Sequence, residues 1–172
     1  MGVSRLNHAV LYVRDLDVSA AFYHEVLGFE VVERLADQAA FLRAPDSTND
    51  HDLGLFRMGE AAGPSGAGRT TVGLYHLAWE VSTLGDLEEL QQTLAERGAL
   101  AGASDHGTTK SLYGRDPDGI EFEVVWLIPA HLLTPEDRGM AIKRLDLPRE
   151  IARYGRETRS GLGVSVPLGV SV

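Results

Sequence analysis

Histidine recurs at the same place in two segments that have the alternating pattern of β-strands. His8 lies in Leu6–Val13 (LNHAVLYV), and His76 lies in Leu74–Val81 (LYHLAWEV). A third expected strand, Ile120–Leu127, carries two glutamates on one face, because successive side chains of a strand point to opposite sides. Two imidazoles and one carboxylate make a facial triad, which leaves open positions on a divalent ion, and such vacancies suit non-haem Fe(II). The residue types therefore raise the hypothesis of a metal site built from three strands.

A structural role for these residues stays open at this point. A single histidine on a strand is more often hydrogen-bonded packing than a metal ligand. Because the two histidines stand at equivalent positions of an internal repeat, a structural role and a metal-binding role become equally plausible. A carboxylate in the last strand then favours metal binding. On each strand the opposite face is apolar and is expected to pack against a helix. The faces that carry His8, His76 and the glutamates must therefore line something else.

The elements that must position these side chains repeat in the order β-α-β-β-β. Helical spacing of apolar residues predicts helices over Leu16–Leu27 and Leu84–Ala95. Gly28 and Gly98 stand where a left-handed residue ends each helix. Further strands are expected at Phe29–Leu35, Gln38–Arg43 and Asp52–Met58 in the first copy, and at Ala101–Asp105, Ser111–Arg115 and Ile120–Leu127 in the second.

This pattern predicts an α+β fold in which two paired βαβββ modules form a curved, barrel-like mixed sheet around a metal cleft. We expect one domain over residues 1–172, with modules at 5–58 and 73–128, a linker at 59–72 and a short helical extension at 129–172.

Two features of the extension carry specific expectations. Thr134–Asp137 (TPED) has the cap, proline and acids of a helix start. Ser160–Val172 is rich in small residues without periodicity, so it is either disordered or an arm that packs on a partner chain, and we expect a homodimer.

Composition excludes several classes of protein. The absence of cysteine removes disulfides, thiolate metal sites and cysteine nucleophiles. The net charge of −9 argues against nucleic acid as a partner, since a polyanion needs a basic face. No apolar run is long enough to span a membrane, and the first residues lack the plan of a signal peptide. We therefore expect a cytoplasmic protein that acts on a small molecule.

The segment Leu112–Gly119 (LYGRDPDG) followed by Glu123 resembles the last-strand motif of the vicinal oxygen chelate superfamily, which includes glyoxalases, bleomycin resistance proteins and extradiol dioxygenases. The resemblance extends from about Leu6 to Trp126. In that superfamily the acidic metal ligand commonly stands four residues after the glycine of the Asp-Pro-Asp-Gly turn. The resemblance thus implies His8, His76 and Glu123 as metal ligands and selects Glu123 over Glu121.

Within the superfamily, the chain is most similar to type I extradiol catechol dioxygenases. The strand Asp52–Met58 lacks the central glutamate that a glyoxalase uses as a fourth ligand. In its place, His51, His106 and Tyr113 match the residues that surround the catechol in extradiol enzymes, and Tyr113 precedes Glu123 by ten positions. Most such enzymes have two duplicated domains, and this chain would be a single-domain version.

The resemblance implies Fe(II) as cofactor, and O₂ and a small aromatic diol as substrates. A catechol must lose a proton to chelate the ion, and a neutral imidazole or a tyrosinate can accept it. The resemblance assigns His51 as the acid–base residue beside O₂, and His106 and Tyr113 as partners of the catechol oxygens. Without this resemblance, the same residues have plain structural roles. His51 would be an exposed loop residue, His106 would be a turn residue, and Tyr113 would be a half-buried packing residue.

Two other functions are open for the same scaffold. With Mn(II), Ni(II) or Zn(II) the triad can support a glyoxalase-like lyase, isomerase or thiol transferase. A protein that binds an antibiotic needs no metal at all. The identity of the catechol and the bond that is cleaved are not written in the sequence.

Overall fold

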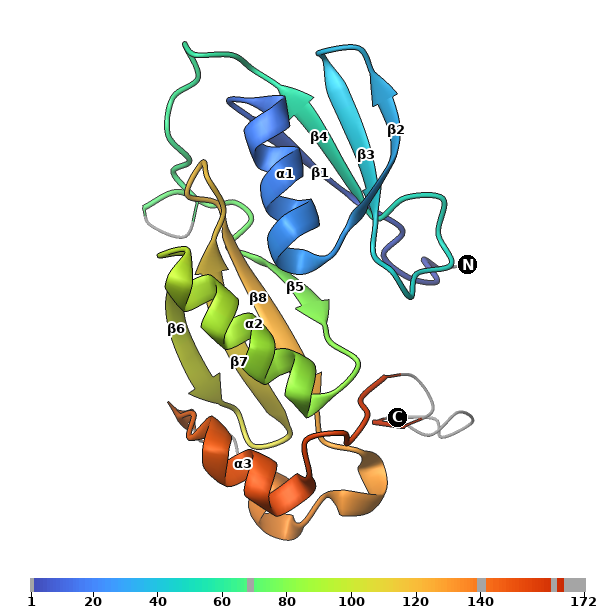
Figure 1. Ribbon diagram of the computed structural model, residues 1–172, viewed down its shortest axis with the longest axis vertical. Coiled ribbons are helices and arrows are strands. Elements are labelled where there is room, and N and C mark those ends of the chain that lie inside the picture. Colours follow the sequence, from blue (N-terminus) through green and yellow to red (C-terminus); the bar gives the residue numbers. More distant parts are fainter. Residues whose placement is uncertain (1, 68–69, 139–141, 162–163, 166–172) are drawn as a thin grey trace. The chain divides into compact units, whose positions relative to one another are not determined.

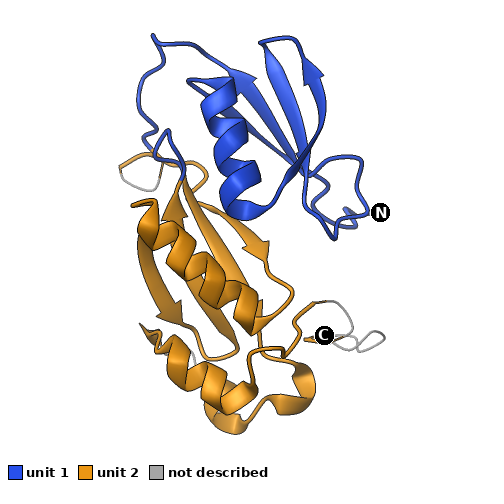
Figure 2. Ribbon diagram, viewed as in Figure 1, with its two compact units in different colours: residues 1–66, 116–120 blue, residues 67–115, 121–172 orange. Residues whose placement is uncertain are grey.

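The computed structural model describes residues 2–67, 70–138, 142–161 and 164–165 (Figure 1). The chain forms two compact units (Figure 2). Unit 1 comprises residues 1–66 and 116–120, and unit 2 comprises residues 67–115 and 121–172. The helix and strands of each predicted module belong to one unit.

Unit 1 is a four-stranded sheet with one helix on it (Figure 1). Its elements are β1 (Ala9–Val13), α1 (Leu16–Leu27), β2 (Glu30–Leu35), β3 (Ala39–Arg43) and β4 (Leu53–Arg57). The strand order is β1-β4-β3-β2, in which β1 and β4 are parallel and the other pairs are antiparallel. The helix-side residues Leu11 and Val13 of β1 are buried, whereas Val10 and Tyr12 on the other face are exposed.

Local sequence explains where α1 begins and ends. The Asp15 side chain accepts hydrogen bonds from the backbone N–H groups of Asp17 and Val18, which satisfies the free donors of the first turn. Gly28 ends the helix with φ of 75°, a left-handed conformation that glycine adopts at little cost. The alternating strand and the capped helix together bury one face of the sheet, as predicted.

Unit 2 repeats this plan and extends it. Its elements are β5 (Leu77–Glu80), α2 (Leu84–Glu96), β6 (Leu100–Asp105), β7 (Thr109–Arg115), β8 (Glu121–Leu127), β9 (Lys143–Arg144) and α3 (Leu147–Tyr154), with 3₁₀ helices at Ala130–Leu132 and Pro135–Arg138. The strand order is β5-β8-β7-β6-β9, and β5 is parallel to β8. Thr83 and Asp86 form a capping box at the start of α2.

The α+β class and the two βαβββ modules are confirmed. Over the described residues the strands form two separate sheets, of four and five strands, and not a closed barrel. The helix expected after Thr134 is a 3₁₀ helix. Helix α3 was not predicted, although Asp146 caps it and Pro148 stands in its first turn, which is a usual start signal.

The turn between β7 and β8 is part of unit 1 although both strands belong to unit 2. The Asp116 carboxylate accepts a hydrogen bond from the Tyr23 hydroxyl at 3.2 Å, and Asp118 accepts one from the backbone N–H of Arg14 at 2.9 Å. Burial of Asp116 raises the pKa of its carboxyl to about 6. The Asp-Pro-Asp-Gly turn therefore contributes to the core of unit 1.

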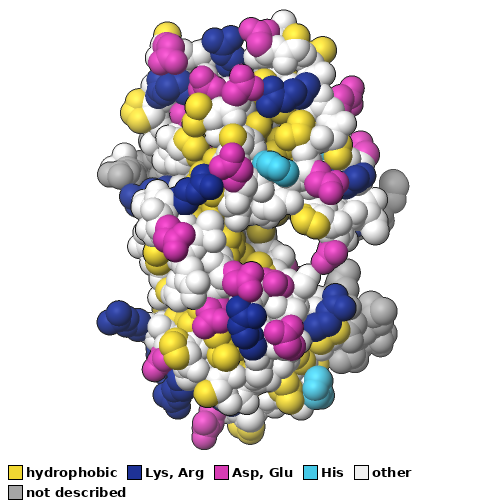
Figure 3. Space-filling model, in the orientation of Figure 1, with side chains coloured by type: hydrophobic (Ala, Val, Ile, Leu, Met, Phe, Trp, Pro, Cys, Tyr) yellow, Lys and Arg dark blue, Asp and Glu magenta, His cyan; other side chains and the backbone are white. Residues whose placement is uncertain are grey.

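Of the C-terminal stretch Ser160–Val172, residues 162–163 and 166–172 lie outside the described residues. Ser160 is buried, and its hydroxyl hydrogen-bonds to Glu80. None of the helices described is long and apolar enough to cross a membrane. Acidic and basic side chains are interspersed over the surface drawn in Figure 3.

Candidate metal centre

Unit 2 brings four of the predicted site residues together. The parallel pairing of β5 and β8 places Ala78 beside Glu123, and His76, two residues earlier, reaches the same carboxylate. The distance from His76 Nε2 to Glu123 Oε2 is 3.1 Å. Because His76 and Glu123 lie on the face opposite the buried Phe122 and Val124, neither side chain is part of the helix-side core.

The geometry of this pair suits two neighbouring ligands of one ion. A nitrogen and an oxygen that are each roughly 2.1 Å from an ion and bind at right angles to each other lie about 3 Å apart. The side chains of His76 and Glu123 are 22% and 15% exposed, so an ion can reach them. His76 Nδ1 is buried and has no hydrogen-bond partner in the described part of the chain. An ion bound at Nε2 would leave Nδ1 unchanged, so the ligand interpretation rests on the Nε2–Glu123 geometry.

Tyr113 and His106 continue the cluster from the neighbouring strand. Tyr113 pairs with Glu123 across β7 and β8, and its hydroxyl donates to Glu123 Oε1 at 3.4 Å. His106 Nε2 lies 2.9 Å from the same hydroxyl. Burial, and then the charge of Glu123, raise the pKa of Tyr113 to about 12. Burial and the neighbouring carboxylate thus favour the protonated hydroxyl of Tyr113 over the tyrosinate.

Glu121 shares the face of Glu123 but has different partners. Its carboxylate lies 3.7 Å from the Arg115 guanidinium. A hydrogen bond to Glu121 raises the pKa of Tyr75, whose ring also packs against His76 at 4.6 Å between centroids. Tyr75 was not singled out in the sequence, because an aromatic residue next to a histidine carries no signal of its own.

Unit 1 brings together the remaining two predicted residues. The ring centroids of His8 and His51 are 4.6 Å apart. Phe41 of β3 packs edge-on against His51 at 5.1 Å. His51 Nδ1 lies 3.2 Å from the exposed Asp50 carboxylate. Alternation along β3 places Phe41 on the face of His51. This alternation could have identified Phe41 from the sequence.

The loop that carries His51 is held by one carboxylate. Asp52 accepts hydrogen bonds from the backbone N–H of Ala44, the hydroxyl of Ser47 and the side-chain amide of Asn49. His51 therefore stands on an ordered turn directly before β4, which explains why a histidine in a polar stretch is only 19% exposed.

The predicted residues thus form two clusters, each within its own unit. His76, Glu123, Tyr113 and His106 make the cluster of unit 2, and His8 and His51 make that of unit 1. Among the described residues, no three histidine, aspartate or glutamate side chains are grouped as a complete metal site.

Comparisons with known proteins identify the family of the chain. A family model described as "Glyoxalase/Bleomycin resistance protein/Dioxygenase superfamily" matches residues 5–124. The chain is 37% identical over 139 residues to biphenyl-2,3-diol 1,2-dioxygenase 3 of Rhodococcus globerulus, covering 77% of this chain and 67% of that protein. It is 34% identical to catechol-2,3-dioxygenase of Bacillus subtilis, covering 70% of this chain and 41% of that protein.

Solved structures show the same fold. A glyoxylase/bleomycin resistance protein/dioxygenase domain from Frankia sp. EAN1pec has a TM-score of 0.61 and 29% identity, and the match covers 72% of this chain and 92% of that one. A glyoxalase/dioxygenase from Nostoc punctiforme has a TM-score of 0.59 at 24% identity, covering 70% and 89% of the two chains, and supports the fold alone.

Proposed function

Because the chain belongs to the glyoxalase/bleomycin resistance protein/dioxygenase superfamily, we propose that it is an Fe(II)-dependent extradiol dioxygenase that opens the ring of a catechol with O₂. The observation that carries the proposal is the cluster of His76, Glu123, Tyr113 and His106 in unit 2. Relatives named as biphenyl-diol and catechol dioxygenases support an oxygenase with an aromatic diol substrate.

His8, His76 and Glu123 would hold the ion. When bound, the ion would supply adjacent positions for both catechol oxygens and for O₂. One relative is named as a manganese-dependent 2,3-dihydroxybiphenyl 1,2-dioxygenase, at 26% identity, so Mn(II) is the first alternative to iron.

The chain's own residues would move the protons. Tyr113 and His106, whose side chains are in contact, would hydrogen-bond to the catechol oxygens and orient them. In unit 1, Asp50 faces His51 Nδ1 and can fix the orientation of its ring. His51 would then accept the proton that the catechol releases and return it for O–O cleavage.

The test is to load the protein with Fe(II) under anaerobic conditions and mix it with O₂ and a panel of unsubstituted, alkyl-substituted and aryl-substituted catechols. We expect O₂ uptake and a yellow ring-opened product with at least one of them. His51→Ala is expected to lower turnover by about 100-fold or more while the iron content stays at the wild-type level, because general acid–base catalysis contributes about that much. Stoichiometric iron without O₂ uptake on any catechol would contradict the proposal.

A further inference from the structure

A buried lysine connects the turn that carries His106 to the C-terminal helix α3. Lys110 on β7 is 1% exposed, and its ammonium lies 2.6 Å from Asp105 Oδ1 and 3.2 Å from Glu150 Oε2. The ammonium also donates a hydrogen bond to the Gly107 carbonyl oxygen at 3.2 Å. Burying an ammonium is unfavourable unless it is paired, so these contacts fix where the side chain of Lys110 lies.

The same contacts hold the turn between β6 and β7. Asp105 Oδ1 accepts a hydrogen bond from the Gly107 N–H at 2.8 Å, and Lys110 binds the Gly107 carbonyl, so both backbone polar groups of Gly107 are bound. The His106 N–H donates to the Thr109 carbonyl at 3.0 Å. His106 precedes Gly107 directly, and its ring is in contact with Tyr113. The position of this turn therefore determines where the His106 imidazole lies.

The C-terminal segment braces the turn in two ways. Strand β9 pairs with the end of β6, placing Lys143 opposite Asp105. From α3, Glu150 reaches Lys110 and is itself only 6% exposed. The Glu150 contact is an ion pair without the alignment of a hydrogen bond, since Oε2 has no hydrogen-bond partner among the residues described. The family model ends at residue 124, so β9 and α3 lie outside the matched region.

The space next to Glu150 indicates what the loss of its ion pair with Lys110 would do. A cavity of about 170 Å³ is bordered by Asp105, Gly107 and Glu150. Without the Glu150 carboxylate, water and the Lys110 ammonium can move into this space, and the Gly107 carbonyl then loses its donor.

We propose that Lys110 and Glu150 are positioning residues, which fix the His106 turn against the C-terminal helix through the chain Glu150–Lys110–Asp105. This inference rests on the proposed function for its effect on catalysis. Neither residue is in contact with the predicted metal ligands or would touch the substrate, and both act through the position of His106.

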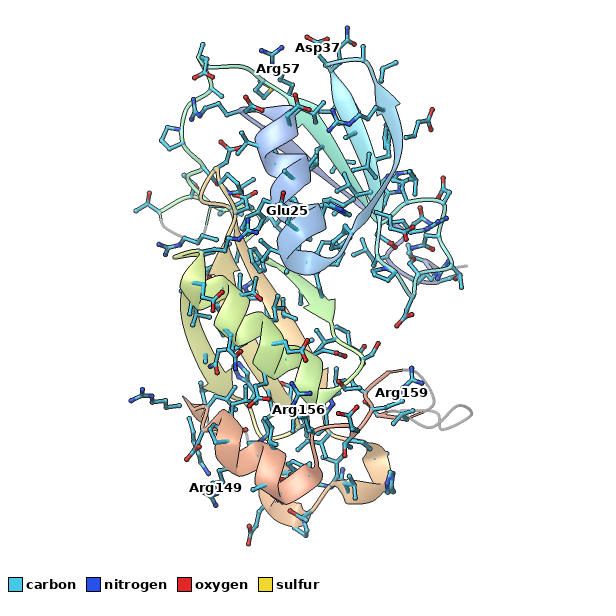
Figure 4. The ribbon with its side chains drawn as sticks, viewed as in Figure 1. Glu25, Asp37, Arg57, Arg149, Arg156 and Arg159 are labelled. Carbon is cyan, nitrogen blue, oxygen red and sulfur yellow. The ribbon has the colours of Figure 1, made fainter. Side chains whose placement is uncertain are left out.

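The first experiment is amide hydrogen exchange on the full chain, followed by mass spectrometry of peptides that cover residues 104–110. Glu150→Ala is expected to speed exchange in this turn about tenfold, and Glu150→Asp, which keeps a carboxylate that can pair with Lys110, to restore part of the protection. Arg149→Ala is the matched control. Arg149, labelled in Figure 4, projects from the same helix, and its side chain has no ion pair or hydrogen bond in the described ranges. Equal exchange in wild type and Glu150→Ala would overturn the proposal.

The second experiment is steady-state ring cleavage by the iron-loaded variants. Glu150→Ala is expected to lower kcat about tenfold with unchanged iron content and KM within threefold, because a misplaced catalytic group affects the reaction more than binding. Glu150→Asp should recover part of kcat, and Arg149→Ala should match the wild type. A wild-type kcat in Glu150→Ala would show that the contact between Glu150 and Lys110 has no role in the reaction.

Two further outcomes separate this inference from the proposed function. If Glu150→Ala does not fold, Asp105→Asn replaces it, since it keeps an acceptor for Gly107 and weakens only the pairing with Lys110. If the wild type binds iron but cleaves no catechol, the proposed function is wrong, and the exchange rates alone decide whether Glu150 fixes the His106 turn.

Discussion

At the scale of single residues, the two glutamates of β8 show how much a strand pattern can decide. Alternation puts Glu121 and Glu123 on one face, and only the resemblance to a known motif separates them in the sequence. The structure gives them different partners. Glu123 contacts His76 and Tyr113, whereas Glu121 is paired with Arg115. Partners brought by other strands are not written in the local sequence.

These partners predict different effects of the same substitution. Glu123→Gln is expected to weaken divalent metal binding about 100-fold or more, because a neutral amide replaces a charged ligand. Glu121→Gln, the matched control on the same face, is expected to keep metal affinity within about threefold. Anaerobic calorimetric titration with Fe(II) or Mn(II) measures the metal affinity of both variants. Equal loss in the two variants would mean that the face as a whole, and not Glu123, attracts the ion.

At the scale of elements, the sequence was most informative where local chemistry is sufficient. Caps and apolar spacing located α1 and α2, and β9 was missed because two residues carry no periodicity. The inclusion of Asp116–Ile120 in unit 1 depends on contacts with Tyr23 and Arg14, which no local pattern reveals. Surface ion pairs such as Asp37–Arg57 and Arg156–Glu88, whose arginines are labelled in Figure 4, are equally unreadable from the sequence, and they contribute little to stability.

A second buried carboxylate, Asp137, also holds α3. It accepts hydrogen bonds from Thr134, from both terminal nitrogens of Arg153, and from Tyr154. Burial raises the pKa of Asp137, but the hydrogen bonds from Thr134 and Arg153 outweigh it and hold the pKa at about 2, below its ordinary value of 3.8. A carboxyl whose pKa is depressed on folding stabilises the protein above its unfolded pKa, and this contribution is lost as pH falls through the folded pKa.

We therefore expect Asp137→Asn to lower the free energy of unfolding by about 1–2 kcal/mol at pH 7. The difference from wild type should shrink as the pH falls from about 4 to about 2. Urea unfolding at several pH values measures it, with Glu136→Gln as control, because that neighbouring carboxylate is exposed. A difference that is constant down to pH 2 would show that the charge of Asp137 does not stabilise this segment.

At the scale of the whole molecule, the internal repeat located the candidate ligands, and the structure assigns them to two units. His76 and Glu123 belong to unit 2, and His8 belongs to unit 1 beside His51. The central claim of the proposed function is that His8, His76 and Glu123 are the metal ligands. A homodimer and a location in the cytoplasm stay predictions from the sequence.

Metal titration of the full chain tests this claim most directly. The experiment compares the Fe(II) stoichiometry and affinity of wild type, His8→Ala, His76→Ala and His131→Ala under anaerobic conditions. His131 is an exposed histidine outside both clusters, so its substitution is the control. The account predicts one ion per chain, affinity lowered about 100-fold or more by either of the first two substitutions, and no change with the third. One ion bound to His8→Ala with wild-type affinity would contradict it.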